Sequence, residues 1–75
     1  MKPTIHAIQL AVCAEFQIAQ SEMLGRSRKA DIVRARHEAM LRARETGASF
    51  PKIGREFHRN HSTVIAACKK AIVNG

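Results

Sequence analysis

The chain has 75 residues, of which 45% are apolar, and a formal net charge of +7. This length has room for one small domain with a single core, which excludes a catalytic domain with its own substrate cleft. Tryptophan and tyrosine are absent, helix-favouring residues such as alanine, arginine and glutamate are plentiful, and strand-type alternation is missing, so the predicted fold class is all-α.

The first predicted element is a helix over about residues 4–16. Its apolar residues recur at helical spacing, and the pattern reaches just beyond its end: Ile5, Ile8, Val12, Phe16 and Ala19. The sequence SEML then predicts one short helical turn that is capped by Ser21. Residues 25–30, GRSRKA, break the apolar pattern with three positive charges in six residues, which predicts an exposed basic loop.

The next predicted helix has Asp31 as its cap and ends at Thr46 and Gly47. Its inward side is formed by Ile32, Ala35, Ala39, Met40 and Ala43. Alanine on that side lets a neighbouring helix approach closely. The arginines at positions 34, 36, 42 and 44 occupy the rest of the helix, and each can be a solvated surface residue as readily as a contact to a partner.

A further helix is predicted to begin at Ser49, with Pro51 in its first turn, where a missing N–H does no harm. Its apolar anchors, and the small residue at which another helix could cross at close range, are Ile53, Phe57 and Gly54. The sequence HRN, residues 58–60, predicts a tight turn, after which Asn60 caps the last helix. That helix has these inward residues: Val64, Ile65, Ala67, Cys68, Ala71 and Ile72.

Residues 49–73 therefore follow the helix-turn-helix plan, inside a single domain of residues 1–75 with four to five helices. In that plan the second helix enters the major groove of DNA by its N-terminal residues, which are here His61, Ser62 and Thr63. Free N–H groups and the positive end of the helix dipole favour an anion at the same place. His61 as a mere neighbour of the cap is the alternative interpretation.

Positive charge is concentrated in the later part of the chain. Residues 1–25 have a net charge of −1, whereas residues 26–75 have twelve Lys and Arg against four Asp and Glu, a net charge of +8. This asymmetry predicts a polyanionic partner, either nucleic acid or an anionic membrane surface. The chain has no apolar run near the ~20 residues of a membrane span, and its start is too polar for a signal peptide, so we expect a soluble, intracellular protein.

Cys13 and Cys68 lie far apart without CxxC spacing, each on an apolar-periodic face, which predicts two buried thiols and no disulfide. His58, His61 and Cys68 do not predict zinc, because Cys68 faces inward and no fourth ligand lies nearby. A carboxylate pair, a phosphate-binding loop and an activated nucleophile are also missing. We therefore expect no enzyme, no metal and no cofactor.

Three motifs resemble those of one known family: an arginine-rich helix with RxR followed by AM, the run SFPKIGxxF, and the run RNHSTVIxAxKK. Upstream, IQLAVCAEFQIAQSEML is similar to the family's first helix and short acidic turn. Over about residues 5–72 the chain resembles the C-terminal DNA-binding domain of the bacterial replication initiator DnaA.

The resemblance implies binding of duplex DnaA boxes through two grooves. Arg28 matches an arginine that enters the minor groove, and the residues that match base contacts in the major groove are Asn60, His61 and Ser62. The expected phosphate contacts are Thr63, Arg44 and Arg59, which match family positions, together with the neighbouring cations Arg26, Lys29 and Lys52. The turn FHRNH is one residue shorter than the family's FGGRDH, and Asn60 replaces Asp, so an amide there could also pair with adenine.

Two classes of function fit these observations. The first is a sequence-preferring, double-stranded DNA-binding module that occupies DnaA-box-like sites as a stand-alone, monomeric regulator of replication or transcription, cytoplasmic and associated with the nucleoid. The second is a protein-interaction factor that binds the full-length initiator or another replication or transcription protein. The joint presence of Arg28, His61 and Ser62 favours the first. A membrane-surface role is weaker, and without a Walker A sequence we expect no nucleotide-driven initiation cycle.

Overall fold

The computed structural model describes the backbone of residues 3–74 and the side chains of residues 3–70. This part of the chain forms five α-helices and no strand: α1 (Ile5–Phe16), α2 (Gln20–Leu24), α3 (Ala30–Glu45), α4 (Phe50–Glu56) and α5 (His61–Asn74). The predicted all-α class is confirmed. The predicted basic loop is shorter by one residue, because Ala30 already belongs to α3, and the name basic loop is used below for residues 25–29.

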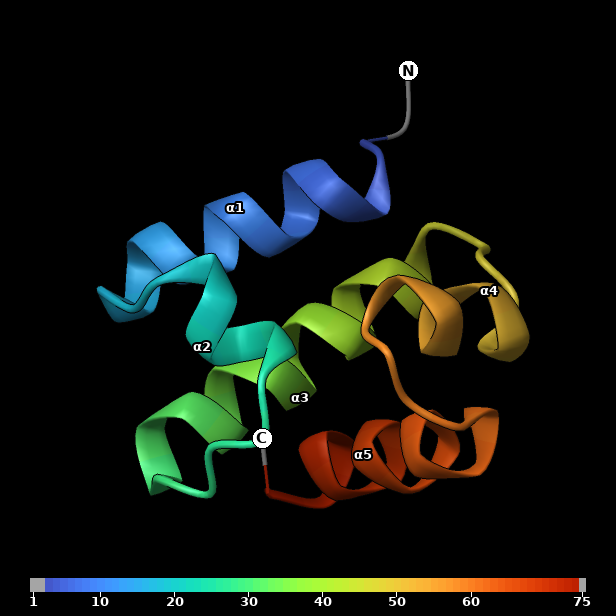
Figure 1. The fold of residues 1–75 in the computed structure, drawn as a ribbon. Helices are drawn as coiled ribbons and strands as arrows, with labels where there is room; N and C mark the ends of the chain where they lie inside the picture. Colours follow the sequence, from blue (N-terminus) through green and yellow to red (C-terminus); the bar gives the residue numbers. More distant parts are fainter. Residues whose placement is uncertain (1–2, 75) are drawn as a thin grey trace.

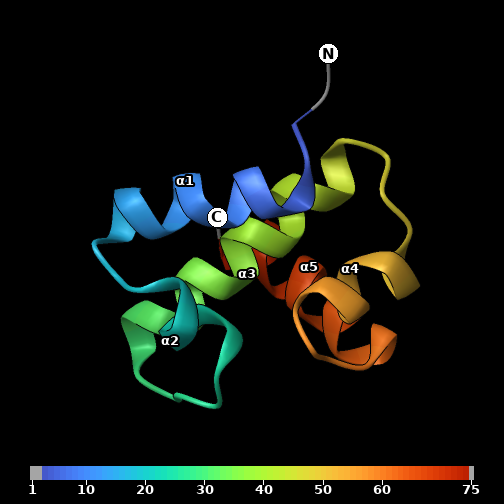
Figure 2. The same cartoon turned by 45° about the horizontal axis from the view of Figure 1, so that its top comes forward.

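The longest helix, α3, is the centre of the fold, because it contacts each of the other four helices. Figure 1 shows α1 crossing one side of α3 and α5 lying along the other side. In Figure 2, α4 lies against α5, and the basic loop extends from the end of α2 to the start of α3. The helix-turn-helix of α4 and α5 therefore packs against α3.

Small residues let the neighbouring helices approach α3 closely. Ala35, Ala39 and Ala43 are completely buried on α3, as their spacing predicts. The larger side chains that fill the space around them with no exposed surface come from all the other helices: Val12, Met23, Ile53, Phe57 and Val64. Phe57, at the end of α4, is the largest of these. The predicted inward positions Ala71 and Ile72 lie outside the described side chains.

Three helices begin at a side-chain cap, and the cap at Asn60 is the one that the sequence predicted. The Thr4 and Ser49 hydroxyls accept hydrogen bonds from the N–H groups three residues later, at 3.0 and 3.3 Å, and the Asn60 carboxamide oxygen accepts from Ser62 N–H at 2.9 Å. At its other end, α3 stops at Thr46, and Gly47 follows with a φ of 96°, a conformation that glycine adopts without strain.

Two predicted caps are wrong, because both helices start earlier than expected. Ser21 lies inside α2, where the Glu22 carboxylate reaches back and accepts a hydrogen bond from Ala19 N–H at 3.0 Å. Lys29 occupies the cap position of α3, and Asp31 lies two residues later, in the first turn of the helix. The Asp31 carboxylate accepts a hydrogen bond from Ile32 N–H at 3.0 Å. The carboxylates of Glu22 and Asp31 both lie in the first turn of their helix, where the positive end of the helix dipole stabilises a negative charge.

Gly54 lies where the backbone of the turn and of the first residue of α5 approaches α4 closely. A Cβ at this position would lie 2.6 Å from the carbonyl oxygen of Arg59 and 3.3 Å from the backbone nitrogen of His61. The Arg59 N–H in turn donates to the Gly54 carbonyl at 2.7 Å. The missing side chain therefore lets the turn between α4 and α5 fold back onto α4.

Candidate nucleic-acid interface

The start of α5 presents three consecutive exposed side chains, those of His61, Ser62 and Thr63. Asn60 holds this helix end from outside, because its carboxamide oxygen accepts from Ser62 N–H and its backbone carbonyl accepts from Thr63 N–H at 3.0 Å. The cap uses the side-chain oxygen of Asn60 and leaves its NH2 group as a donor. Because Ser62 N–H and Thr63 N–H already donate to Asn60, fewer N–H groups at the start of α5 are free to bind an anion than the sequence suggested.

The turn before α5 is tight because two residues take unusual positions. His58 has a φ of 55°, in the left-handed region, and Gly54 lets the backbone of Arg59 approach α4. The turn occupies residues 57–60, and Phe57, its first residue, is fully buried. Burial of Phe57 on one side and exposure of His61 on the other fixes the orientation of the start of α5.

The basic loop is held by a buried arginine of α3. Arg36 is only 7% exposed, and its Nε donates to the Met23 carbonyl at 2.8 Å. Its Nη2 donates to the carbonyls of Gly25 and Ser27, both at 3.2 Å. The pKa of Arg36 is lowered by burial and by the nearby positive charge of Arg59. Arg36 is therefore a structural residue and not one of the solvated arginines of the helix.

Sequence periodicity contains a signal for this role of Arg36. The residue lies four positions after Ile32 and four before Met40, both completely or almost completely buried, so it belongs to the inward stripe of α3. An arginine on a buried stripe needs acceptors for its donors. Grouping Arg36 with the other arginines of α3 missed that requirement.

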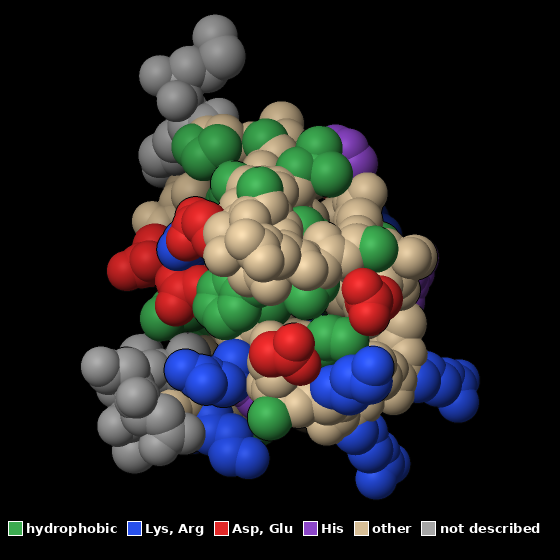
Figure 3. All heavy atoms as spheres, turned by 90° about the vertical axis from the view of Figure 1, so that its left-hand side faces the viewer, with side chains coloured by type: hydrophobic (Ala, Val, Ile, Leu, Met, Phe, Trp, Pro, Cys, Tyr) green, Lys and Arg blue, Asp and Glu red, His purple; other side chains and the backbone are tan. Residues whose placement is uncertain are grey.

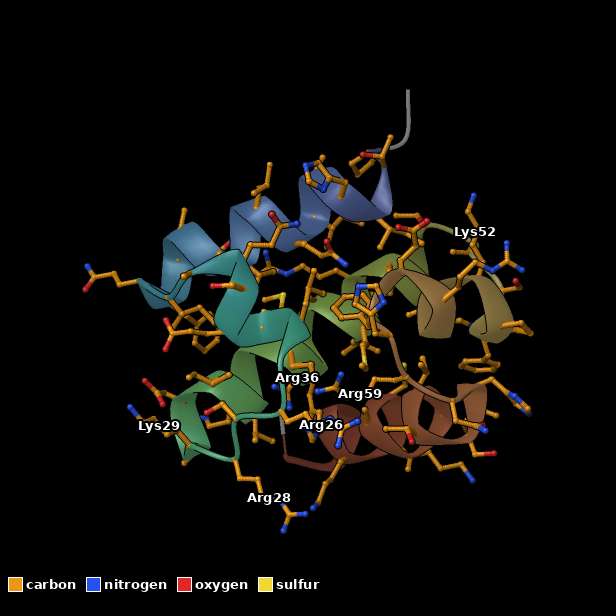
Figure 4. The ribbon with its side chains drawn as sticks, in the orientation of Figure 1. Arg26, Arg28, Lys29, Arg36, Lys52 and Arg59 are labelled. Atoms are coloured by element: carbon orange, nitrogen blue, oxygen red, sulfur yellow. The ribbon has the colours of Figure 1, made fainter. Side chains whose placement is uncertain are left out.

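The basic loop and the turn before α5 line one open depression of about 420 Å³. Its lining comes from the loop, α3 and the turn: Arg26, Ser27, Arg28, Val33, Arg36, His58, Arg59 and Asn60. Four of these residues are arginines and none is acidic. In Figure 4, Arg26, Arg36 and Arg59 lie close together beside α5, while Arg28 extends away from the ribbon. Residues predicted for the two grooves thus meet at a single surface.

The basic loop has three exposed cations, two of which, Arg26 and Arg28, line the depression. Arg26, Arg28 and Lys29 are exposed on the basic loop, and Lys29 points to the other side from Arg28 in Figure 4. Figure 3 shows Lys and Arg side chains gathered in the lower part of one face, below a band of Asp and Glu. Figure 1 places the basic loop and the start of α3 at that level.

Arg44 and Lys52 lie apart from the basic loop. Arg44, near the end of α3, is exposed, donates from Nη1 to the Ala48 carbonyl at 2.9 Å and stacks over the Phe50 ring at 4.6 Å from its centre. Lys52 is exposed on the first turn of α4, at the opposite end of the molecule from Arg28 in Figure 4. A phosphate contact by Lys52 requires DNA that extends across α4.

Arg42 is engaged within the protein. Its guanidinium forms ion pairs with Glu15 of α1, at 2.6 Å, and with Glu38 one turn earlier, at 2.9 Å. The hydrogen bonds that Arg42 donates to these carboxylates raise the pKa of Arg42, and the pKa of Glu15 is lowered in return. Arg42 therefore ties α3 to α1 and is a poor candidate for a phosphate contact.

The other candidate chemistry of the chain has no assembled site among the described residues. Cys13 and Cys68 are buried and free, as predicted, and burial is the main cause that raises the pKa of both thiols, which keeps them protonated. Across the described residues, no three His, Cys, Asp or Glu side chains gather into a possible metal site. In the same part of the chain, each helix is too short or too polar to cross a membrane.

Comparison with known proteins gives one consistent result. Residues 5–71 match the family described as bacterial dnaA protein helix-turn-helix. The chromosomal replication initiator protein DnaA of Sphingopyxis alaskensis is 46% identical over 68 residues, which cover 88% of this chain and 15% of that protein. The DnaA proteins of a Synechococcus species and of Acinetobacter baumannii are 45% and 44% identical over 89% and 92% of the chain. The chain spans about 15% of the length of these curated relatives. No solved structure matches it.

Proposed function

Because the chain belongs to the bacterial DnaA helix-turn-helix family, we propose that it binds double-stranded DNA and prefers sites similar to the DnaA box. The observation that best supports this function is the shared depression, in which the basic loop and the turn before α5 meet among four arginines without an acidic residue. A duplex that lies across this surface meets a loop cation and a helix N-terminus at the same time.

In the proposed complex the start of α5 enters the major groove. His61 and Ser62 contact base edges there, and Thr63 contacts a phosphate. Asn60 acts differently from the family's acidic residue, because its side-chain oxygen already caps α5. The remaining NH2 group donates to an acceptor on a base edge, for which N7 of a purine or O4 of thymine is suited.

The basic loop is proposed to reach the adjacent minor groove through Arg28. A narrow, A·T-rich minor groove has an enhanced negative potential that attracts an arginine, and Arg28 is exposed and extends away from the loop. Arg26 and Lys29 flank it and contact phosphates on either side. Arg59 is half-buried and presents only part of its guanidinium to a phosphate.

Phosphate contacts farther from the groove are assigned to Arg44 and Lys52. Both are exposed, and Arg44 is held in place by the Ala48 carbonyl and the Phe50 ring. We expect the chain to bind single, non-palindromic sites as a monomer and to act by occupancy, as a nucleoid-associated regulator of replication or transcription. Binding then leaves the duplex paired and excludes the full-length initiator from a common site.

Selection of bound duplexes from a random pool tests this proposal. We expect a single recovered motif that resembles a DnaA box, with the largest deviation at the position that Asn60 contacts. In a competition on that duplex, an excess of the 75-residue chain should displace the initiator. Recovery of no motif, together with tight binding to the initiator protein itself, would instead establish an interaction factor.

A further inference from the structure

The Gly25 carbonyl, at the start of the basic loop, accepts hydrogen bonds from two arginines of different elements. Arg36 of α3 donates from Nη2 at 3.2 Å, and Arg59, in the turn before α5, donates from its own Nη2. Arg59 also donates from Nη1 to the carbonyls of Leu24, at 3.4 Å, and Phe57, at 3.0 Å. A single guanidinium therefore joins the end of α2, the loop and the turn, across 34 residues of sequence.

These contacts differ from an ion pair. All the acceptors are neutral backbone carbonyls, so none of these hydrogen bonds neutralises the positive charge of Arg36 or Arg59. Arg36 attaches the loop to α3, whereas Arg59 attaches it to the helix-turn-helix. The planar fork of a guanidinium can reach several carbonyls at once, which the single ammonium group of a lysine cannot do with the same geometry.

The residues next to this link are the proposed DNA readers. Asn60 and His61 directly follow Arg59, and Arg28 lies three residues after Gly25. The half-buried Arg59 side chain fills the space between the two segments and lines the same depression as Arg28 and Asn60. A displacement of the loop relative to α5 would have to break the bonds of Arg59.

We propose that Arg59 is a positioning residue that holds the basic loop against the start of α5, so that the loop and the helix engage two grooves of one duplex as a single unit. This inference rests on the proposed function. It assigns Arg59 a role beyond neutralising a phosphate, because the contribution of Arg28 to binding then depends on Arg59.

A double-mutant cycle on the selected duplex tests the dependence. Arg28→Ala should lower the affinity about tenfold in the parent protein and about twofold or less in an Arg59→Ala background, since residues that act through a common contact are not additive. Arg59→Ala should also relax the base preference at the Arg28 end of the site. Preference at the end read by His61 should remain.

Two further variants separate positioning from charge. Arg55 is exposed on α4, so Arg55→Ala removes the same charge without touching the loop, and its effect should multiply with that of Arg28→Ala. Arg59→Lys keeps the positive charge but removes the planar guanidinium, so it tests whether the guanidinium geometry is required. It should behave like Arg59→Ala in the cycle if positioning is the role, and like the parent if a phosphate contact is the role. Arg59→Lys also serves if Arg59→Ala fails to fold.

The outcomes are distinguishable. A parent that selects a motif but shows multiplicative effects of Arg28→Ala with both Arg59 variants would overturn the positioning role and leave the proposed function intact. A parent that selects no motif would overturn the proposed function and the positioning role together. Non-additivity with Arg59, combined with additivity with Arg55, supports the inference.

Discussion

At the scale of single residues, the exposed side chains at the start of α5 determine whether the protein distinguishes sequences. His61→Ala and Ser62→Ala should each cost on the order of 1–3 kcal/mol of binding free energy on the preferred duplex, the usual worth of a good base contact, and much less on random duplex. Titration of both duplexes at one salt concentration measures the difference. Equal losses on the two duplexes would show that α5 contacts only the DNA backbone.

The cap residue gives a second test at the same scale. Asn60→Asp preserves an oxygen that can accept from Ser62 N–H, so α5 should remain capped and the protein folded. The substitution removes the NH2 donor, and preference at one base pair should shift toward cytosine, whose N4 group donates to a carboxylate. A repeat of the duplex selection with this variant measures the shift. An unchanged motif would exclude Asn60 as a base contact.

At the scale of elements, the α4–turn–α5 unit depends on the close approach at Gly54. Alanine is the better helix former by about 1 kcal/mol, so Gly54→Ala would stabilise an isolated helix. Here its Cβ would lie 2.6 Å from the Arg59 carbonyl oxygen, and overpacking against backbone costs about 1–3 kcal/mol. We expect a net decrease in the free energy of unfolding, measured by denaturant titration. A more stable variant would contradict this account of the turn.

The turn itself contains a residue, His58, whose replacement by glycine should increase the free energy of unfolding. His58 is exposed and has a φ of 55°, a conformation that costs an L-residue roughly 1–2 kcal/mol and glycine almost nothing. After the larger chain entropy of glycine in the unfolded state is subtracted, His58→Gly should stabilise the fold by up to about 1 kcal/mol. Gln17→Gly, at the end of α1 with the same φ, should behave alike.

At the scale of the whole molecule, the uneven charge predicts binding that weakens steeply with salt, by about 0.9 log units per tenfold change in salt for each neutralised phosphate. Arg44→Ala should weaken all duplexes alike and reduce that slope by about 1. Arg42→Ala, also near the end of α3, should leave the slope unchanged because Glu15 and Glu38 already hold the guanidinium. Salt titrations of the parent protein and of the two variants measure these slopes. Binding that does not change with salt would contradict a polyanionic partner.

Much of the candidate interface could be predicted because its signals are local. The predicted cap Asn60 accepts from an N–H group two residues away, so the sequence around the start of α5 contains the whole interaction. The apolar stripes likewise follow from the period of the helix. The starts of α2 and α3 were misplaced because their cap positions are held by Ala19 and Lys29, whose side chains make no capping hydrogen bond, so no local signal marks either start.

By itself, the sequence determined the helices, the alanine face of α3, the exposed basic loop and the order of residues at the start of α5. Only the tertiary structure decided which carbonyls Arg36 bonds to, that Arg42 pairs with Glu15 and that Arg59 links the loop to the turn. The physical reason lies in the acceptors. Arg36 and Arg59 bond to backbone carbonyls, which every residue has, so no side-chain pattern identifies their acceptors, and folding alone brings the partners together.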